Sequence, residues 1–352
     1  MAACSSKLWD PGRSLSRSLR CSSSYSLCRP NRYDDLAWLP NLCYTLEVVS
    51  DSKGPDLLKR WTTALMNVLL LVIAPWPAVS QANGSNLEGL LSITELESGG
   101  RIGVAALDTA SGSLFGYRSD ERFAMCSTFK LLLSSAVLSR VDNSTENLDR
   151  EVPIAQDDLV PWAPFIQERL DARAQSVTIR ELCVAVMVIS DNSAANILLR
   201  EIGGTSALNR YVRSLGDSMT RLDHFEPHLN TNVPADPTDS TTPSAFLDTM
   251  RQVLVGDVLS GQSRNLLLDW LTQSVTGTNR LRGGFDPRWR SGNKSGSGNN
   301  ATANDVAIVW PDHDDRPIII AAFYAGSSLD TGGRDDVLAA VGRAIVRHFG
   351  RD

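Results

Sequence analysis

Histidine and cysteine are scarce in this chain. Only four of its 352 residues are histidine, and of its six cysteines only Cys126 and Cys183 follow the first 82 residues. Two cysteines form one bridge at most, which excludes a disulfide scaffold. A zinc centre needs several nitrogen or sulfur ligands, so any such centre would have to be built around the paired His224 and His228.

Positive charge is also limited. The formal net charge is −6, and the first 80 residues carry +3 from nine Lys/Arg and six Asp/Glu, so the remainder carries −9. An acidic body argues against nucleic acid as a partner. Beyond the leader, no apolar run reaches the length of a membrane span. The content of 42% hydrophobic and 21% charged residues is typical of a globular protein with one large domain or two.

The start of the chain differs from the rest. Residues 1–54 are rich in Ser, Arg and Cys, which indicates a misassigned start or an extended leader. Residues 55–82 contain Lys59, Arg60, a short apolar run and small residues at the end, the pattern of a secretory signal peptide. The alternative is a buried core helix, which two prolines would break. We therefore expect a periplasmic or secreted bacterial protein without stable membrane anchoring after signal cleavage.

Strand and helix patterns after the leader fall into three blocks. A helix over 86–98 and a hairpin over 102–117 come first, and strands return near 289–326 before a last helix. Between them the helical pattern covers 127–141, 178–203, 204–216, 242–256 and 260–275. We predict an α/β fold, with an antiparallel five-stranded sheet flanked by helices from 83–126 and 277–352. An all-helical lobe, 127–276, is inserted, and the site lies at the junction.

The stretch "CSTFKL" places Ser127 three residues before Lys130, on one face of a helix if Ser127 opens it. An adjacent amine with a lowered pKa can take the proton from a serine hydroxyl and make it nucleophilic. Such a pair also arises by chance on solvated helices. Here the apolar residues around the lysine argue against an ordinary surface charge.

Two further polar motifs interrupt apolar segments. The first motif separates "CVAVMVI" from "AANILL" and consists of Ser190, Asp191 and Asn192. It predicts a break that lines a site, although a buried cap or turn would also explain it. Lys294 begins "KSGSG" within a predicted strand, where small residues would let a substrate lie against the strand. An ordinary glycine-rich hairpin is the alternative there.

The three motifs in this order are far more specific than any one of them. Together they resemble the signature of class A serine β-lactamases, and the resemblance covers nearly all of residues 86–350. It implies that Ser127 attacks the β-lactam carbonyl of penicillins and cephalosporins. It also implies that Lys130 and Glu226 share the proton transfers of acylation. Ser190 would relay a proton to the ring nitrogen, and Glu226 with Asn230 would activate the deacylating water.

The resemblance also implies how substrate is held. The backbone N–H groups of Ser127 and Ser297 would form the oxyanion hole, and Lys294 with Ser295 would hold the substrate carboxylate. Relatives often place an arginine on the next strand for that carboxylate. "TANDVAIVW" has none, and Arg280 would replace it. Trp162 resembles the aromatic wall of the cleft, although a core tryptophan fits its surroundings nearly as well. The implied substrate-binding residues are Asn192, Asn230, Lys294, Ser295, Ser297, Arg280 and Trp162.

Several positions depart from the family pattern. Cys126 matches a cysteine that pairs in a carbapenem-hydrolysing subgroup, but the partner position holds Gly298. Cys183 matches a cysteine that forms a disulfide in other members, but the position of its partner holds Ser134 here. We therefore predict no disulfide and weak carbapenem turnover. Asn293 stands where relatives usually have aspartate.

The stretch "RLDHFEPHLN" contains the remaining departure. His224 replaces an arginine that pairs in relatives with an aspartate, here expected to be Asp239. Histidine is only partly charged near neutrality and makes a single bond to a carboxylate, whereas arginine makes two. We hypothesise a looser loop that tolerates bulky oxyimino-cephalosporins.

A zinc hydrolase built on His224 and His228 is the first competing class. Their spacing of four fits a helical metal motif, but Glu226 is in the wrong position and Pro227 would break the helix. We expect neither a metal nor another cofactor.

Two more alternatives remain. A penicillin-recognising peptidase or sensor would share the serine and lysines but lack a deacylating base, which Glu226 supplies here. A non-catalytic helical binding protein would leave three polar motifs in apolar surroundings unexplained. We expect a monomer whose partners are small β-lactams.

Overall fold

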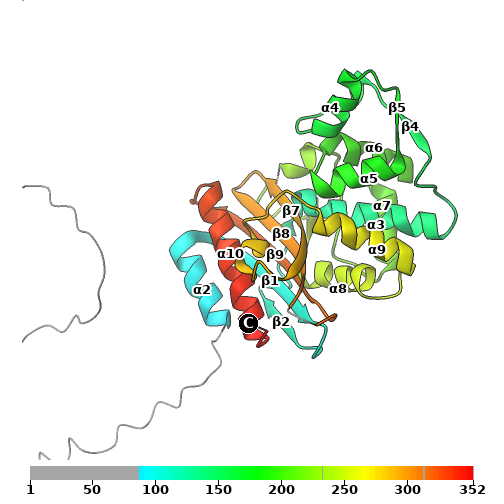
Figure 1. The fold of residues 1–352 in the computed structure, drawn as a ribbon. Coiled ribbons are helices and arrows are strands. Elements are labelled where there is room, and N and C mark those ends of the chain that lie inside the picture. The colour runs from blue at the N-terminus through cyan, green and yellow to red at the C-terminus, as the bar shows by residue number, and fades with distance from the viewer. Residues whose placement is uncertain (1–86, 232, 312–313, 352) are drawn as a thin grey trace, which may run out of the picture. The chain divides into compact units, whose positions relative to one another are not determined.

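The computed structural model describes residues 87–231, 233–311 and 314–351 (Figure 1). The predicted leader and signal peptide lie outside these residues. No described helix is long and apolar enough to cross a membrane.

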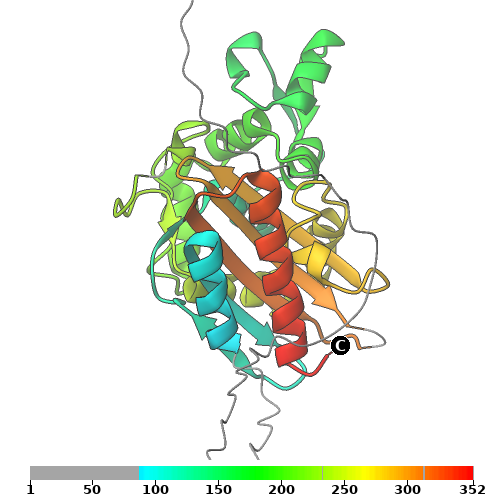
Figure 2. The same ribbon diagram turned by 90° about the vertical axis from the view of Figure 1, so that its left-hand side faces the viewer.

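A five-stranded antiparallel sheet is the centre of the fold, with strand order β2-β1-β9-β8-β7. This confirms the predicted fold class. Two helices, α2 (Leu87–Ser98) and α10 (Thr331–His348), lie side by side across one face (Figure 2), and the helical region lies on the other side (Figure 1). The strands are β1 (Gly99–Asp108), β2 (Leu114–Tyr117), β7 (Arg290–Gly298), β8 (Thr302–Trp310) and β9 (Ile318–Ser327).

Strand β9 shows why the sheet is covered on both faces. Its run "IIIAAFY" is apolar at every position, because alternate side chains enter two different cores. Ile318, Ile320 and Tyr324 pack in the core shared with α2 and α10. Ile319 and Phe323 pack in the larger core shared with the helical region.

Helix α3 (Phe129–Asp142) runs through the middle of the helical region. Ten consecutive residues, 129–138, are buried, as expected of a helix surrounded by others. The other helices are α4 (Pro164–Asp171), α5 (Ile179–Val188), α6 (Asn192–Ile202), α7 (Gly204–Ser214), α8 (Pro243–Leu254) and α9 (Gly261–Thr272).

The helical segment is more varied than its pattern indicated. The helix expected over 178–203 is interrupted between α5 and α6, at the predicted polar break. Residues 127–276 are not all helical, since β4 (Glu151–Pro153) pairs with β5 (Ser176–Thr178). A second ribbon joins β3 (Phe123–Ala124) to β6 (Ser240–Thr241). Both ribbons are too short to produce a clear alternating pattern. The domain boundaries proposed from the sequence stay a prediction.

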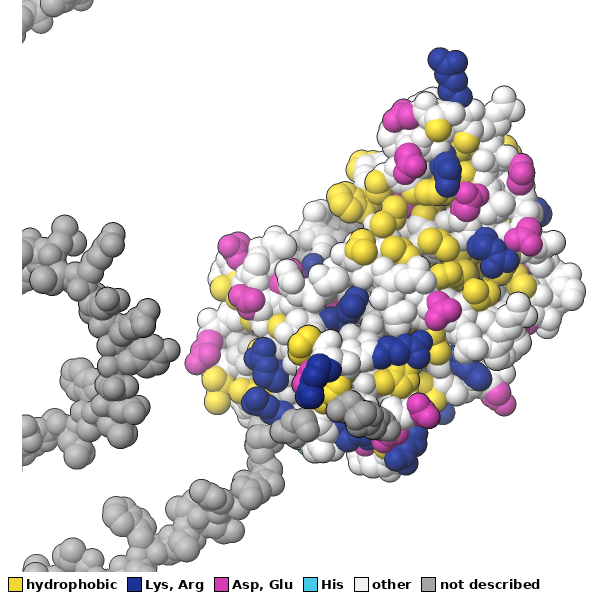
Figure 3. Space-filling view, in the orientation of Figure 1, with side chains coloured by type: hydrophobic (Ala, Val, Ile, Leu, Met, Phe, Trp, Pro, Cys, Tyr) yellow, Lys and Arg dark blue, Asp and Glu magenta, His cyan; other side chains and the backbone are white. Residues whose placement is uncertain are grey.

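On the face drawn in Figure 3, hydrophobic side chains gather over the helical region, while acidic and basic side chains are interspersed around them.

Candidate active site

Ser127 lies where the chain enters the central helix. The 3₁₀ turn η1 (Cys126–Thr128) runs directly into α3, so Ser127 stands one turn before Lys130. Lys130 Nζ donates a hydrogen bond to Ser127 Oγ at 3.1 Å, the contact expected from their spacing. Cys126 has a φ of 47°, a conformation that side-chain-bearing residues rarely adopt and that is concentrated at functional sites.

The Lys130 ammonium is buried among oxygen atoms. Its Nζ lies 2.9 Å from Ser190 O, 2.5 Å from Asn192 Oδ1 and 3.1 Å from Glu226 Oε1. Burial lowers the pKa of Lys130, and the neighbouring Glu226 carboxylate opposes that change. An amine with a lowered pKa can act as a proton acceptor for the serine.

Ser190 lies between two lysines in the break that separates α5 from α6. Its Oγ is 3.3 Å from Lys130 Nζ and 3.0 Å from Lys294 Nζ. Burial, together with the charge of Lys130, holds the pKa of Lys294 well below its usual range. Asp191 accepts backbone amides at the starts of α6 and α4, so this residue of the motif fixes the break in place.

Glu226 faces the nucleophile from a loop. Besides the contact with Lys130, its Oε1 accepts from Ser127 Oγ at 3.3 Å, and its Oε2 accepts from Asn230 Nδ2 at 2.6 Å. Asn196 of α6 holds the backbone of Glu226 from both sides, with bonds of 2.9 Å to its N–H and to its carbonyl. Sequence reasoning missed Asn196, although it lies one helical turn after Asn192 of the polar motif.

Strand β7 forms the opposite wall. A Cβ at Gly296 would lie 2.8 Å from Met125 O and 3.1 Å from Ser127 N, so the strand approaches η1 closely only because this residue is glycine. Arg280 donates to Gly296 O at 2.8 Å and to Ser297 Oγ at 2.7 Å. The arginine is therefore tied to the strand that carries Ser297.

A cavity of about 390 Å³ lies between these walls. Trp162 lies at the edge of the cavity, is 64% exposed and donates a hydrogen bond to Ile189 O, so it is a wall residue and not a core tryptophan. Lys294 does not line the cavity, because its buried ammonium stands behind Ser190. The structure adds Thr276 and Gly277, which sequence reasoning missed. The lining residues are Ser127, Trp162, Ser190, Asn192, Asn230, Thr276, Gly277, Arg280, Ser295, Gly296 and Ser297.

Comparison with known proteins supports the same chemistry. The family model described as "Beta-lactamase enzyme family" matches residues 88–349. A β-lactamase of Citrobacter koseri is 37% identical over 289 residues, which cover 82% of this chain and 97% of that protein. β-Lactamase L2 of Stenotrophomonas maltophilia is 41% identical over 251 residues, which cover 71% of this chain and 82% of that protein. The chain belongs to the β-lactamase enzyme family.

Solved structures identify the class. An ancestral class A β-lactamase (GNCA) superposes with a TM-score of 0.72 at 47% identity, covering 74% of this chain and 99% of that one. The putative class A β-lactamase PenP of Rhodopseudomonas palustris gives a TM-score of 0.71 at 43% identity, covering 74% and 98%. The predicted resemblance to class A enzymes is confirmed, and β-lactamase activity follows from membership of this class.

Asp239 joins the two ends of the loop that carries Glu226, a region called here the neck of the loop. Asp239 Oδ1 accepts the backbone N–H groups of Asp223 and His224 at 2.7 and 3.0 Å. Its Oδ2 lies 2.6 Å from His224 Nδ1, which confirms the expected partner of His224. Hydrogen bonding to Asp239 raises the pKa of His224.

The zinc alternative finds no support in this loop. His228 opens a short 3₁₀ turn, η3 (His228–Asn230), so no helix carries both His224 and His228. No group of three or more potential metal-binding side chains occurs among the described residues.

Cys126 and Cys183 are both buried and free. A Cβ on Gly298 would lie 2.6 Å from Cys126 Sγ, so residue 298 lies directly against this thiol. Burial raises the pKa of Cys126 to about 12, which keeps its thiol protonated and unreactive.

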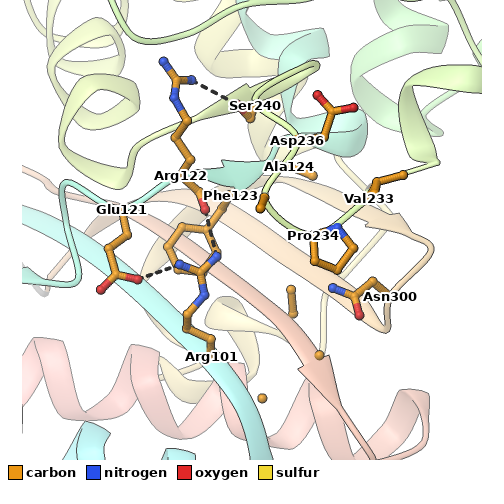
Figure 4. Close-up of a pocket in the computed structure, with 14 residues that line it drawn as sticks. Arg101, Glu121, Arg122, Phe123, Ala124, Val233, Pro234, Asp236, Ser240 and Asn300 are labelled. Carbon is orange, nitrogen blue, oxygen red and sulfur yellow. Dashed lines mark hydrogen bonds and ion pairs between the residues drawn. The ribbon is translucent and has the colours of Figure 1, made fainter.

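A larger cavity, of about 590 Å³, lies between the end of the Glu226 loop and the paired ends of β1 and β9 (Figure 4). There Arg101 lies against the Phe123 ring and pairs with Glu121, and Arg122 reaches Ser240. None of the predicted catalytic side chains lines it. The smaller cavity is the candidate active site, because the predicted side chains of Ser127, Ser190 and Asn192 line it.

Proposed function

We propose that Ser127 opens the β-lactam ring of penicillins and cephalosporins and forms an acyl-enzyme. Its Oγ contacts two proton acceptors, Lys130 Nζ at 3.1 Å and Glu226 Oε1 at 3.3 Å. Burial of the lysine favours its neutral form, and the carboxylate offers a second route for the proton. The backbone N–H groups of Ser127 and Ser297 stabilise the oxyanion.

Ser190 then carries a proton to the departing ring nitrogen. Its hydroxyl contacts Lys130 on one side and Lys294 on the other, so Lys130 can pass the proton taken from Ser127 to Ser190 and replace the one lost to the substrate. Its positive φ of 62° places the hydroxyl at the break between two helices, where it lines the cavity.

Glu226 activates the water that releases the product. Asn230 Nδ2 fixes the carboxylate, and Asn230 Oδ1 is a buried acceptor without a protein partner among the described residues. A water between the two side chains can donate to both, which orients its lone pair toward the acyl carbon. This pair distinguishes a hydrolase from a penicillin-binding peptidase or sensor.

The substrate carboxylate is held by Ser295 and Arg280, with Lys294 adding its field from behind Ser190. Arg280 lines the cavity with a guanidinium that also bonds Asp335 at 2.8 Å, so the cation is held rigidly. Asn192 binds the amide side chain of the substrate, and Trp162 forms the wall of the cleft.

The observation that carries the proposal is the joined cluster of Ser127, Lys130 and Glu226. The test is turnover of nitrocefin by the mature protein, with and without a metal chelator. We expect sustained hydrolysis unaffected by chelator and abolished by Ser127→Ala. Consumption of a single equivalent would identify a binder, and loss with chelator would identify a metal enzyme.

We further propose a periplasmic or secreted monomer that confers β-lactam resistance on its host. The signal-peptide pattern of residues 55–82 supports the proposed export. N-terminal sequencing of the exported protein tests the cleavage site expected near residue 82.

A further inference from the structure

Asp305 of β8 is a fully buried carboxylate that has no part in the proposed reaction. Its Oδ1 accepts from Asn293 Nδ2 at 2.7 Å, and its Oδ2 accepts from the backbone N–H of Leu281 at 3.1 Å. Among the residues that the structure describes, no cation forms an ion pair with it. A buried carboxylate is costly unless its oxygens are satisfied, so these two donors hold it in place.

Asn293 is suited to this contact because its amide both donates and accepts. Its Nδ2 also donates to Thr276 O at 3.0 Å, and its Oδ1 lies 3.4 Å from Arg282 Nη1. An aspartate at this position would have no hydrogen for Asp305 or for the Thr276 carbonyl unless it was protonated. Asparagine therefore satisfies two acceptors that an ionised aspartate would repel.

Both ends of the segment 276–281 are attached to this pair, and Arg280 lies within the segment. Thr276 is bonded to Asn293 at one end, and Leu281 to Asp305 at the other. Thr276 Oγ1 also accepts from Ser295 Oγ at 3.0 Å, inside the cavity.

We infer that Asn293 and Asp305 are positioning residues that dock the segment 276–281 on the sheet and thereby fix Arg280 for the substrate carboxylate. The inference rests on the carboxylate-binding role proposed for Arg280.

The charges around Asp305 fit this role. Burial raises the pKa of Asp305 to about 7, while the cations of Arg280 and Lys294 and the two donors oppose that change. Ionised Asp305 is thus a counter-charge for Arg280, which lines the cavity, and for Lys294, which stands behind Ser190. The other charged group packed on Arg280 is Asp335 of α10.

The test compares benzylpenicillin with its methyl ester, which lacks the carboxylate, in the wild type and Asn293→Asp. We expect Asn293→Asp to raise KM for the acid by about three- to tenfold, the worth of one hydrogen bond, with kcat and ester hydrolysis nearly unchanged. The increase should be larger at pH 8 than at pH 6, because two adjacent carboxyl groups share a proton only at lower pH. An equal effect on acid and ester, or no effect at either pH, would overturn the inference.

Arg280→Lys, which loses the planar guanidinium, tests the carboxylate-binding role of Arg280 separately from the positioning role of Asn293. If it leaves the preference for the acid unchanged, the role of Arg280 fails. If it reduces that preference while Asn293→Asp does not, only the positioning role fails. If Asn293→Asp does not fold, Asn293→Ser replaces it in the test. Its hydroxyl is a donor but is too short to reach Asp305, so we expect the same rise in KM for the acid alone. An equal loss for the ester would count against the inference.

Discussion

The stretch Arg221–Asn230 joins two regions that are stabilised in opposite ways. At Glu226 the carboxylate and Lys130 are both fully buried and bonded on every side. At the neck, the His224 side chain is 53% exposed and contributes one bond to Asp239. Glu226, the proposed base, is held by several buried bonds, whereas the His224 side chain is held by a single contact that solvent can weaken.

This difference indicates that Asp239, and not the His224 side chain, contributes most of the free energy that holds the two ends of the loop together. Exposed ion pairs contribute little, while buried carboxylates that accept backbone N–H groups contribute more. Asp239 accepts two such groups and receives His224 as a third partner. With histidine in place of arginine, the two backbone bonds to Asp239 remain, and only the side-chain contact with Asp239 is weaker.

Breaking the buried pair should have the largest effect. Lys130→Ala leaves Glu226 buried without its cation, and we expect a loss of about 3–5 kcal/mol in the free energy of unfolding. Turnover should fall by about 10²–10⁴-fold. Urea unfolding and nitrocefin kinetics measure these changes. Arg180→Ala, which removes the exposed pair with Asp149, is the control and should cost less than about 1 kcal/mol.

Two asparagines allow a matched test of the backbone around the base. Asn196 bonds both the N–H and the carbonyl of Glu226, and Asn209 bonds Leu222 in the same way, at 2.9 and 2.8 Å. Either alanine variant should lose about 1–3 kcal/mol of stability. Only Asn196→Ala should slow deacylation strongly. Equal deacylation rates in both variants would show that the position of Glu226 does not depend on the two bonds from Asn196.

At the neck, Asp239→Ala should destabilise more than His224→Ala. The first frees two backbone N–H groups, at a cost of about 1–3 kcal/mol, and the second removes one exposed bond worth less than about 1 kcal/mol. Equilibrium unfolding of the two variants at pH 7 provides the measurement. The opposite order would mean that the ring of His224 closes the loop.

The smallest effect concerns His224 and pH. Because Asp239 raises the pKa of His224, the pair stabilises the fold fully below the ordinary histidine pKa of about 6.5 and loses that contribution as pH rises through the raised value. His224→Arg keeps the charge at all these pH values. It should lower the ratio of ceftazidime to benzylpenicillin turnover, and do so more at pH 8 than at pH 6. An unchanged ratio at both pH values contradicts the hypothesis of a looser loop.

How much of this site could be predicted depends on how local each contact is. The contact of Ser127 with Lys130 follows from helical spacing, and the break at Ser190 follows from polar residues in an apolar run. By contrast, Glu226 meets Lys130 across nearly a hundred residues, and only the family resemblance pointed to that meeting. Asn196 had a signal, one turn after the polar motif, which went unused.

The fold shows the same division. The sheet and most helices carry clear apolar patterns, such as the continuous apolar run of β9, which faces two cores. Helix α4 was missed although Pro164 at its first position is a typical start signal. The two short ribbons are held by neighbouring elements, and no pattern of two or three residues could indicate them.

The most direct test of the account is the fate of the acyl-enzyme in Glu226→Gln. Glutamine keeps the shape of the side chain but cannot take a proton from water. We expect this variant to consume about one equivalent of nitrocefin and to gain the mass of the opened substrate on Ser127, while the wild type and the exposed control Glu168→Gln turn over continuously. Continuous turnover by Glu226→Gln without an accumulated adduct would contradict the role of Glu226 as the deacylating base.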